Sequence, residues 1–179
     1  MDHADHVALI RDGVSGAGSR WLELGAGRGA FTLALADLLG PGGEILAVDR
    51  DAGDLRQLSA ALSTAYPAVA VTTLAGDFDR PMDLGDGPFD GLLAANSLHF
   101  VRDPAAVLAR LRPLLVPDAR VIVVEYDADR GNPWVPHPFS FATWETIAAS
   151  AGLQGTRLIG RIPSRFLGAI YAAASSVPA

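Results

Sequence analysis

The 179-residue chain contains no cysteine and no lysine. The lack of cysteine excludes disulfides, thiol catalysis, iron–sulfur ligation and cysteine-based zinc sites. The lack of lysine excludes a lysine Schiff base and a phosphate-binding loop that depends on lysine. Charged residues are also few, at 19% of the chain, whereas apolar residues make up 50%. The chain therefore has enough apolar surface to form the core of one domain, which we place at residues 1–179.

Positive charge is in the minority. All 14 basic residues are arginines, and 20 acidic residues give a net charge of −6. Because an acidic domain repels polyphosphate, we expect no nucleic-acid partner. No apolar run is long enough to cross a membrane, and residues 1–6 are acidic rather than apolar, so we expect neither a membrane span nor a secretory signal. These features favour a cytoplasmic protein.

Short β-like runs alternate with helix-like runs along the chain. The expected strands are residues 20–24, 44–49, 69–75, 88–96 and 121–124, and the expected helices are 30–39, 51–65, 104–111 and 141–151, with a turn at 112–119. This order predicts a doubly wound, mostly parallel sheet with helices on both faces. Two further runs, 156–162 and 168–174, have no helix between them. They should form an antiparallel pair joined through Pro163 and Ser164.

A glycine-rich loop follows the first strand, with the sequence Glu23-Leu24-Gly25-Ala26-Gly27-Arg28-Gly29-Ala30. Glycines here allow positive φ and let a ligand approach the backbone, and the next helix offers free N–H groups. Gly25-x-Gly27-x-x-Ala30 also satisfies the dinucleotide fingerprint. Glu23, however, would repel a pyrophosphate and attract a cationic ligand. S-adenosylmethionine, which carries a sulfonium and an ammonium, is such a ligand.

The loop resembles motif I of the class I S-adenosylmethionine-dependent methyltransferases, and the resemblance extends over residues 20–175. Within the class, the chain is most similar to the small-molecule enzymes of the ubiquinone/menaquinone-biosynthesis type. The resemblance implies a seven-stranded Rossmann-like sheet whose last strand is antiparallel. It also implies S-adenosyl-L-methionine as cofactor, S-adenosyl-L-homocysteine as product and a small-molecule acceptor. Residues 1–19 would form a short lid, with a helix over the site at residues 5–13.

The resemblance also assigns the cofactor residues. Asp49, at the end of the second strand, would accept hydrogen bonds from both ribose hydroxyls, with Arg50 beside the adenine. Asp77 would accept the adenine amine, although it is equally suited to close an Asx turn. Asn96 and Ser97 would lie under the methionine part. The expected set is Glu23, Gly25, Ala26, Gly27, Gly29, Asp49, Arg50, Gly76, Asp77, Phe78, Asn96 and Ser97.

Candidate catalytic residues come from two segments. His99 follows the fourth strand, and Glu125-Tyr126-Asp127 ends the fifth. His99, Tyr126 and Asp127 are the candidates for acid–base chemistry, and His99 is preferred as base because histidine ionises near neutral pH. His99 could equally be a half-buried structural histidine.

The loop after the fifth strand carries the other acceptor-side candidates. Trp134, His137 and Phe139 either line an apolar acceptor pocket or only cover the edge of the sheet. His137 with Asp127 and Asp129 shows no recognised metal-ligand spacing, so no metal is expected.

Two other functions fit the same sequence. An NAD-dependent oxidoreductase would use a similar sheet, but Glu23 and the closing antiparallel pair count against it. A catalytically silent S-adenosylmethionine-binding subunit that supports a partner would be consistent with the short lid. Turnover distinguishes the silent subunit from an enzyme, and the identity of the bound ligand distinguishes the oxidoreductase.

Overall fold

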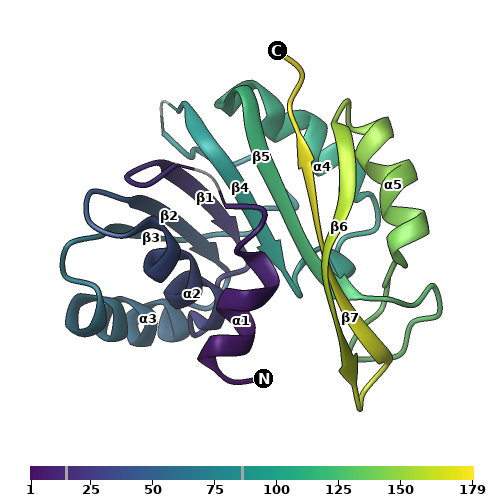
Figure 1. Ribbon diagram of the computed structural model, residues 1–179, viewed down its shortest axis with the longest axis horizontal. Coiled ribbons are helices and arrows are strands. Elements are labelled where there is room, and N and C mark those ends of the chain that lie inside the picture. Colours follow the sequence, from purple (N-terminus) through teal and green to yellow (C-terminus); the bar gives the residue numbers. More distant parts are fainter. Residues whose placement is uncertain (15, 86) are drawn as a thin grey trace.

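The computed structural model describes residues 1–14, 16–85 and 87–179 (Figure 1). The strands are β1 (Arg20–Leu24), β2 (Glu44–Asp49), β3 (Ala70–Ala75), β4 (Phe89–Ala95), β5 (Leu115–Tyr126), β6 (Gln154–Ser164) and β7 (Gly168–Ser176). The helices are α1 (His3–Ile10), α2 (Ala30–Leu39), α3 (Ala52–Ala65), α4 (Pro104–Leu111) and α5 (Phe141–Ser150), with short 3₁₀ helices η1 (Leu98–Phe100) and η2 (Arg112–Leu114).

All seven strands belong to one sheet in the order β3-β2-β1-β4-β5-β7-β6. Strands β1 to β5 are parallel to one another. Strand β7 runs antiparallel to both β5 and β6. The predicted Rossmann-like sheet with an antiparallel closing strand is therefore confirmed. In this order the carboxyl ends of β1, β4 and β5 lie side by side, at the lower edge of the sheet in Figure 1.

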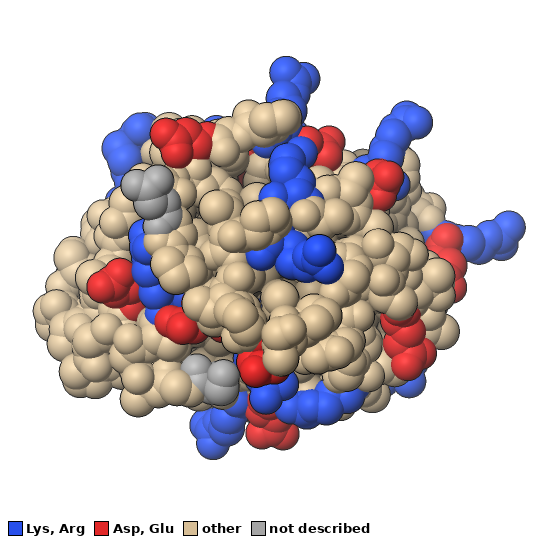
Figure 2. Space-filling view, turned by 90° about the horizontal axis from the view of Figure 1, so that it is seen from above, with Lys and Arg blue, Asp and Glu red and all other residues tan. Residues whose placement is uncertain are grey.

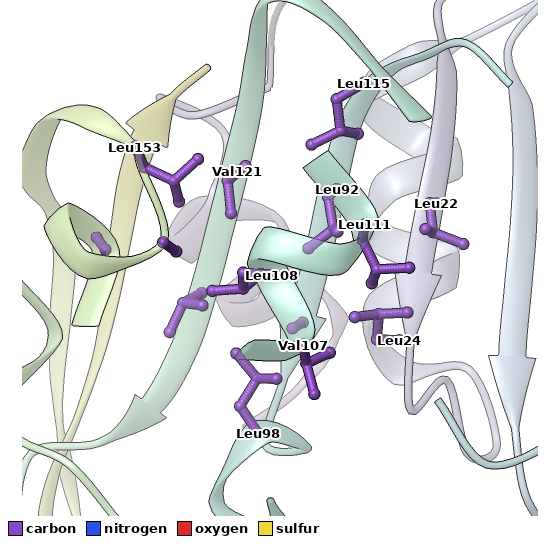
Figure 3. Packing of buried hydrophobic residues seen from close by; sticks show 14 of the residues in the cluster. Leu22, Leu24, Leu92, Leu98, Val107, Leu108, Leu111, Leu115, Val121 and Leu153 are labelled. Atoms are coloured by element: carbon purple, nitrogen blue, oxygen red, sulfur yellow. The ribbon is translucent and has the colours of Figure 1, made fainter. Parts of the chain in front are cut away.

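Two apolar layers hold the helices against the sheet. Buried side chains of α1, α2 and α3 pack on one face, and those of α4 and α5 pack on the other. Figure 3 shows Leu108 and Leu111 of α4 lying over Leu22 and Leu92 of the central strands. All four side chains are buried, so removing any of them would cost about 2–5 kcal/mol of stability, as is usual for leucine in a core.

Side-chain caps start most of the helices. Asp2, Asp51, Asp103 and Ser140 each accept a backbone N–H in the first turn of α1, α3, α4 and α5. The capping box of Asp2 explains why α1 begins at His3, earlier than predicted. Helix α2 differs, because its N-cap residue is Gly29, which provides no side-chain cap. No side chain at the N-cap position accepts the first N–H groups of α2, which lie next to the glycine loop.

Two sequence-based boundaries were wrong. Strand β5 begins at Leu115, inside the predicted turn, because Leu115 is buried and pairs with Phe89 of β4. The irregular residue is Asp118, with φ +61°, which accompanies a shift of register along the β4–β5 pair. Pro163 lies within β6 rather than in the turn. Proline is tolerated there because β6 is at the edge of the sheet.

The face of the molecule near the C-terminus lies at the opposite edge of the sheet from the glycine loop. Figure 2 shows this face, where arginine side chains project with carboxylates among them. Salt screens charges at such a distance, so they have little influence on the glycine loop. Among the described residues, no helix combines the length and apolar character needed to cross a membrane.

Gly91, in the middle of β4, allows the packing between β4 and β1 to be tested. A Cβ added there would lie 2.5 Å from the ring of the fully buried Trp21 on β1. We expect Gly91→Ala to lower the free energy of unfolding by about 1–3 kcal/mol, as overpacking does. Urea denaturation measures this loss. Trp21→Phe makes room, so the double variant should lose less than the sum of the two single losses. Simple additivity would contradict this account of the packing.

Candidate active site

The glycine loop turns sharply between β1 and α2. Gly25 has φ +75°, and a Cβ there would collide with the side chain of Ser97. Gly27 has φ +52°, but a Cβ there would meet nothing within 4 Å. The backbone thus borders an open space at Gly27. Gly29, in contrast, packs against Leu58 of α3 and serves the turn itself.

A cleft of about 320 Å³ opens at the carboxyl edge of the sheet beside this loop. It brings together most of the predicted cofactor residues: Gly25, Gly27, Asp49, Arg50, Asp77, Phe78, Asn96 and Ser97. Asp79, Phe100 and Val101 complete the lining and were not predicted. Gly29 and Gly76 are not among the lining residues, and a Cβ on Gly76 would meet Met82. We call this space the cofactor cleft.

Asp49 is held by backbone donors at the end of β2. Its Oδ2 accepts the N–H of Gly27 at 2.8 Å, and its Oδ1 accepts the N–H of Asp51 at 2.9 Å. Each carboxylate oxygen keeps a lone pair free for a second donor. The side chain is therefore fixed in place and can still accept a pair of hydroxyl groups.

Asp77 closes a turn and also lines the cleft. Its Oδ1 accepts the N–H of Asp79 at 3.2 Å, as in an Asx turn, and its Oδ2 lies 3.7 Å from Nε of Arg80. Arg110 of α4 donates to the carbonyl oxygens of Phe78 and Asp79. The two sequence-based interpretations of Asp77 are thus compatible, because one oxygen serves the turn while the residue borders the cleft.

Glu23 lies in the interior, with only 1% of its surface exposed. Burial raises the pKa of this carboxyl to about 7, and the negative charge of Asp49 adds to the shift. Its Oε2 has no hydrogen-bond partner among the described residues, and the same is true of Oδ1 of Asn96. Both residues, together with Ala26 and with Met1 and His6 at the start of the chain, line a hollow beside the cofactor cleft. Arg28 lines the same hollow. The two unpartnered acceptor oxygens are themselves buried, and a group with several N–H donors, such as an ammonium, would satisfy them.

His99 is buried and paired with Glu125, a pairing that the sequence analysis did not identify. Nδ1 of His99 lies 2.7 Å from Oε2 of Glu125. Oε1 of Glu125 accepts the backbone N–H groups of Ser97, at 3.1 Å, and His99, at 3.2 Å. Glu125 is fully buried at the end of β5. This arrangement places the imidazole proton on Nδ1 and leaves Nε2 as an acceptor.

A second cleft, of about 440 Å³, contains His99. Its lining consists of Asn96, His99, Phe100, Tyr126, Trp134, Val135 and Phe166. Asn96 and Phe100 also line the cofactor cleft, so the two spaces share a wall. We call the second space the acceptor cleft. Tyr126 contributes to it, with its ring centroid 6.1 Å from that of His99.

Several acceptor-side candidates lie outside both clefts. Asp127 pairs with Arg161 at 2.6 Å and accepts the N–H of Phe141 at 3.0 Å, so it holds the start of α5. His137 is exposed, and Phe139 is buried against Trp144. Of the three loop candidates, only Trp134 faces a cleft. Among the described residues, no cluster of three or more histidine or acidic side chains is arranged to bind a metal.

Glu125 could have been found from one signal. It directly follows the most apolar run of the chain, Val121 to Val124, and the neighbouring strand leads into Asn96 and His99. A carboxylate at the end of such a strand lies beside the residues that follow the adjacent strand, which here are Asn96 and His99. Phe166 had no comparable signal, because it reaches the cleft from the turn between β6 and β7.

Comparison with known proteins gives the family. A methyltransferase-domain family model matches residues 22–121, more than half of the chain. The chain is 34% identical over 100 residues to nocamycin O-methyltransferase from Saccharothrix syringae, a match that covers 56% of this chain and 35% of that protein. The chain spans about a third of the length of the curated relatives that it matches.

Solved structures share the fold. A methyltransferase from Aquifex aeolicus described as S-adenosylmethionine-dependent superposes with a TM-score of 0.75 at 18% identity, covering 97% of this chain and 89% of that one. The YcgJ protein from Bacillus subtilis gives a TM-score of 0.77 at 13% identity, covering 99% and 100% of the two chains. None of these relatives is a ubiquinone or menaquinone enzyme by name, so that subclass stays a prediction. The chain belongs to the methyltransferase-domain family, and it has the fold of these solved structures.

Proposed function

We propose that this domain transfers a methyl group from S-adenosylmethionine to a hydroxyl group of a small molecule, with His99 as the base. The observation that carries this proposal is the shared wall of the two clefts. Asn96 and Phe100 line both, so molecules in the two clefts would meet at these residues. The similarity to nocamycin O-methyltransferase supports a small-molecule acceptor and an oxygen as the acceptor atom.

The cofactor supplies a methyl group that its sulfonium charge already activates. In our proposal Asp49 binds the ribose hydroxyls, Asp77 takes the adenine amine, and Glu23 with Asn96 holds the ammonium. The acceptor hydroxyl would donate a hydrogen bond to Nε2 of His99, which would take the proton as the oxygen bonds to the methyl carbon. The methyl–sulfur bond would break in the same step, with S-adenosylhomocysteine as the leaving group. Glu125 stabilises the imidazolium that forms, because its Oε2 is already 2.7 Å from Nδ1. Alignment of the two reactants accounts for much of the rate.

The expected ligand class gives the first functional test. Calorimetry should show saturable binding of S-adenosylhomocysteine and none of NAD, the ligand of the alternative oxidoreductase. Gly27→Val should abolish binding, because Gly27 has positive φ and its added side chain would enter the cleft. Asp49→Ala should weaken binding by about 1.5–3 kcal/mol.

Asp77→Asn is the milder companion variant. Asparagine can still accept the N–H of Asp79, so the turn survives while the adenine contact loses its charge. It should cost less than Asp49→Ala. Unchanged affinity in both aspartate variants would place the nucleoside elsewhere.

Glu23 predicts a pH dependence for cofactor binding. Its pKa of about 7 means that the carboxyl is largely protonated in the empty site at lower pH. An ammonium binds the ionised form, so affinity for S-adenosylhomocysteine should rise by up to about tenfold per pH unit below pH 7 and then level off. Calorimetry in buffers of different ionisation enthalpy would detect the released proton. Glu23→Gln should bind more weakly than wild type at and above pH 7, approach wild type at low pH, and lose this slope; a slope that persists in the variant would refute the assignment.

The same group acts on the stability of the unliganded protein in the opposite direction. Folding raises the Glu23 pKa from 4.5 to about 7, so the protonated form is the one that folding favours. Its stabilising contribution is present below about pH 4.5 and is lost as pH rises through about 7. Denaturation of wild type and Glu23→Gln across this range provides the matched control.

If His99 is the base, its removal should lower turnover without weakening cofactor binding. With an identified acceptor, His99→Ala should lower kcat by roughly 100-fold while the affinity for S-adenosylhomocysteine stays within a few-fold. Glu125→Gln should also lower kcat, because a neutral amide stabilises the imidazolium less. The wild-type rate should rise with pH, as is general for a reaction that needs an unprotonated base. Full activity of His99→Ala with a flat pH profile would show a structural histidine, and no turnover with any acceptor would favour the silent-subunit alternative.

A further inference from the structure

We infer that the acceptor cleft binds a flat, uncharged, apolar molecule whose hydroxyl group faces His99. This inference rests on the proposed function and adds the chemical class of the acceptor. Its basis is an unusual concentration of exposed aromatic rings. Phe100, Trp134 and Phe166 are 51%, 71% and 48% exposed, and all three line this one cleft. Among the described residues, the only other exposed large apolar side chains are Met1, at 53%, and Leu158, at 44%.

The rings come from three segments that the fold brings together. Phe100 lies on η1, Trp134 in the loop after β5, and Phe166 in the turn between β6 and β7. The ring centroids of Trp134 and Phe166 are 6.4 Å apart with the planes at 76°, and those of Tyr126 and Phe166 are 5.7 Å apart with the planes at 55°. Rings at such angles present both faces and edges, against which a planar ligand can stack or pack edge-on.

The exposed tryptophan is held in place by its own loop. Oδ1 of Asn132 accepts the N–H groups of Trp134 at 2.9 Å and Val135 at 3.0 Å. Val135 is buried beneath the loop, and the N–H of His137 donates to the carbonyl of His99. The indole is therefore presented to solvent on a fixed frame. A preorganised aromatic surface of this kind loses little entropy when a ligand covers it.

Charge is missing from the lining of this cleft. None of its described lining residues is an arginine or a carboxylate, and the polar ones are Asn96, His99 and Tyr126. A charged ligand would lose its hydration here without gaining a counter-ion. An uncharged ligand with a single polar group would place that group beside His99 and leave its apolar part against the rings.

A small molecule fits this cleft better than a second copy of the chain. The volume of about 440 Å³ is within the usual range for small-ligand sites. The cleft also shares the lining residues Asn96 and Phe100 with the cofactor cleft, and its wall includes His99, which is paired with Glu125. A docking face between two proteins needs neither a buried dyad nor access to the cofactor.

Three matched probes test the acceptor class by calorimetry on protein saturated with S-adenosylhomocysteine. Naphthol is flat and uncharged, decahydronaphthol is its saturated counterpart, and hydroxynaphthoate adds a carboxylate. We expect naphthol to bind at least about fivefold more tightly than either. Equal or tighter binding of the carboxylate or of the saturated alcohol would overturn the inference.

Two variants test whether the aromatic rings of the acceptor cleft bind naphthol. Trp134→Ala should weaken naphthol at least about fivefold and leave S-adenosylhomocysteine unchanged, because Trp134 does not line the cofactor cleft. Leu158→Ala, which removes an exposed apolar side chain from β6 outside the cleft, should change neither. Unaltered naphthol affinity in Trp134→Ala would refute the inference.

Two measurements separate this inference from the proposed function. Failure of S-adenosylhomocysteine to bind would sink the proposed function itself, whereas its binding alongside indifference to the three probes would sink only the acceptor class. Sedimentation velocity tests the alternative that a second copy of the chain occupies the acceptor cleft. A dimer that Trp134→Ala dissociates would show that a second copy covers the rings, and would also overturn the inference.

Discussion

One buried carboxylate joins the two halves of the site. Glu125 accepts three hydrogen bonds, from the backbone N–H groups of Ser97 and His99 and from the imidazole of His99. It therefore fixes both the chain segment that borders the cofactor cleft and the side chain that borders the acceptor cleft. A buried carboxylate is costly unless such donors surround it, and here all three come from one turn of four residues. Removing any donor would leave charge unmatched inside the core.

The sheet makes this arrangement possible. Because β4 lies between β1 and β5, the segment after β4 can bond to both neighbours. Asn96 continues the ladder by donating to Val124, while the hydroxyl of Ser97 donates to Leu24 at the end of β1. Asn96 takes a left-handed conformation, with φ +51°, which turns the chain across the edge of the sheet. Asparagine tolerates this conformation better than most residues. The shared wall of the two clefts is thus a consequence of strand order.

The sequence predicted local features better than long-range contacts. Apolar runs and caps depend on neighbouring residues. The strands, the helices and the glycine loop were therefore largely predicted from apolar periodicity and from the residues that begin and end each element. The pairing of Glu125 with His99 depends on the register of β4 against β5, which no local pattern encodes. Gly29 and Gly76, which match motif positions, do not line the cofactor cleft, and an added Cβ there would meet Leu58 and Met82. Asp127 was a candidate by proximity in sequence, but alternation along the chain turns its carboxylate toward Arg161.

Electrostatics distinguishes the two clefts. The cofactor side is lined by charged residues: the acidic ones are Glu23, Asp49, Asp77 and Asp79, and the arginines are Arg28 and Arg50. Burial raises the pKa of Glu23, the most buried member, to about 7, and the charge of Asp49 adds to the shift. A positively charged ligand beside Glu23 would favour the ionised carboxylate, so the proposed binding of the cofactor and the ionisation of Glu23 would be coupled. Across Asn96 and Phe100 the lining becomes aromatic and uncharged. In the proposed reaction, a hydroxyl that loses its proton there has His99 beside it to receive the proton, so the proposals of a neutral acceptor and of a histidine base support each other.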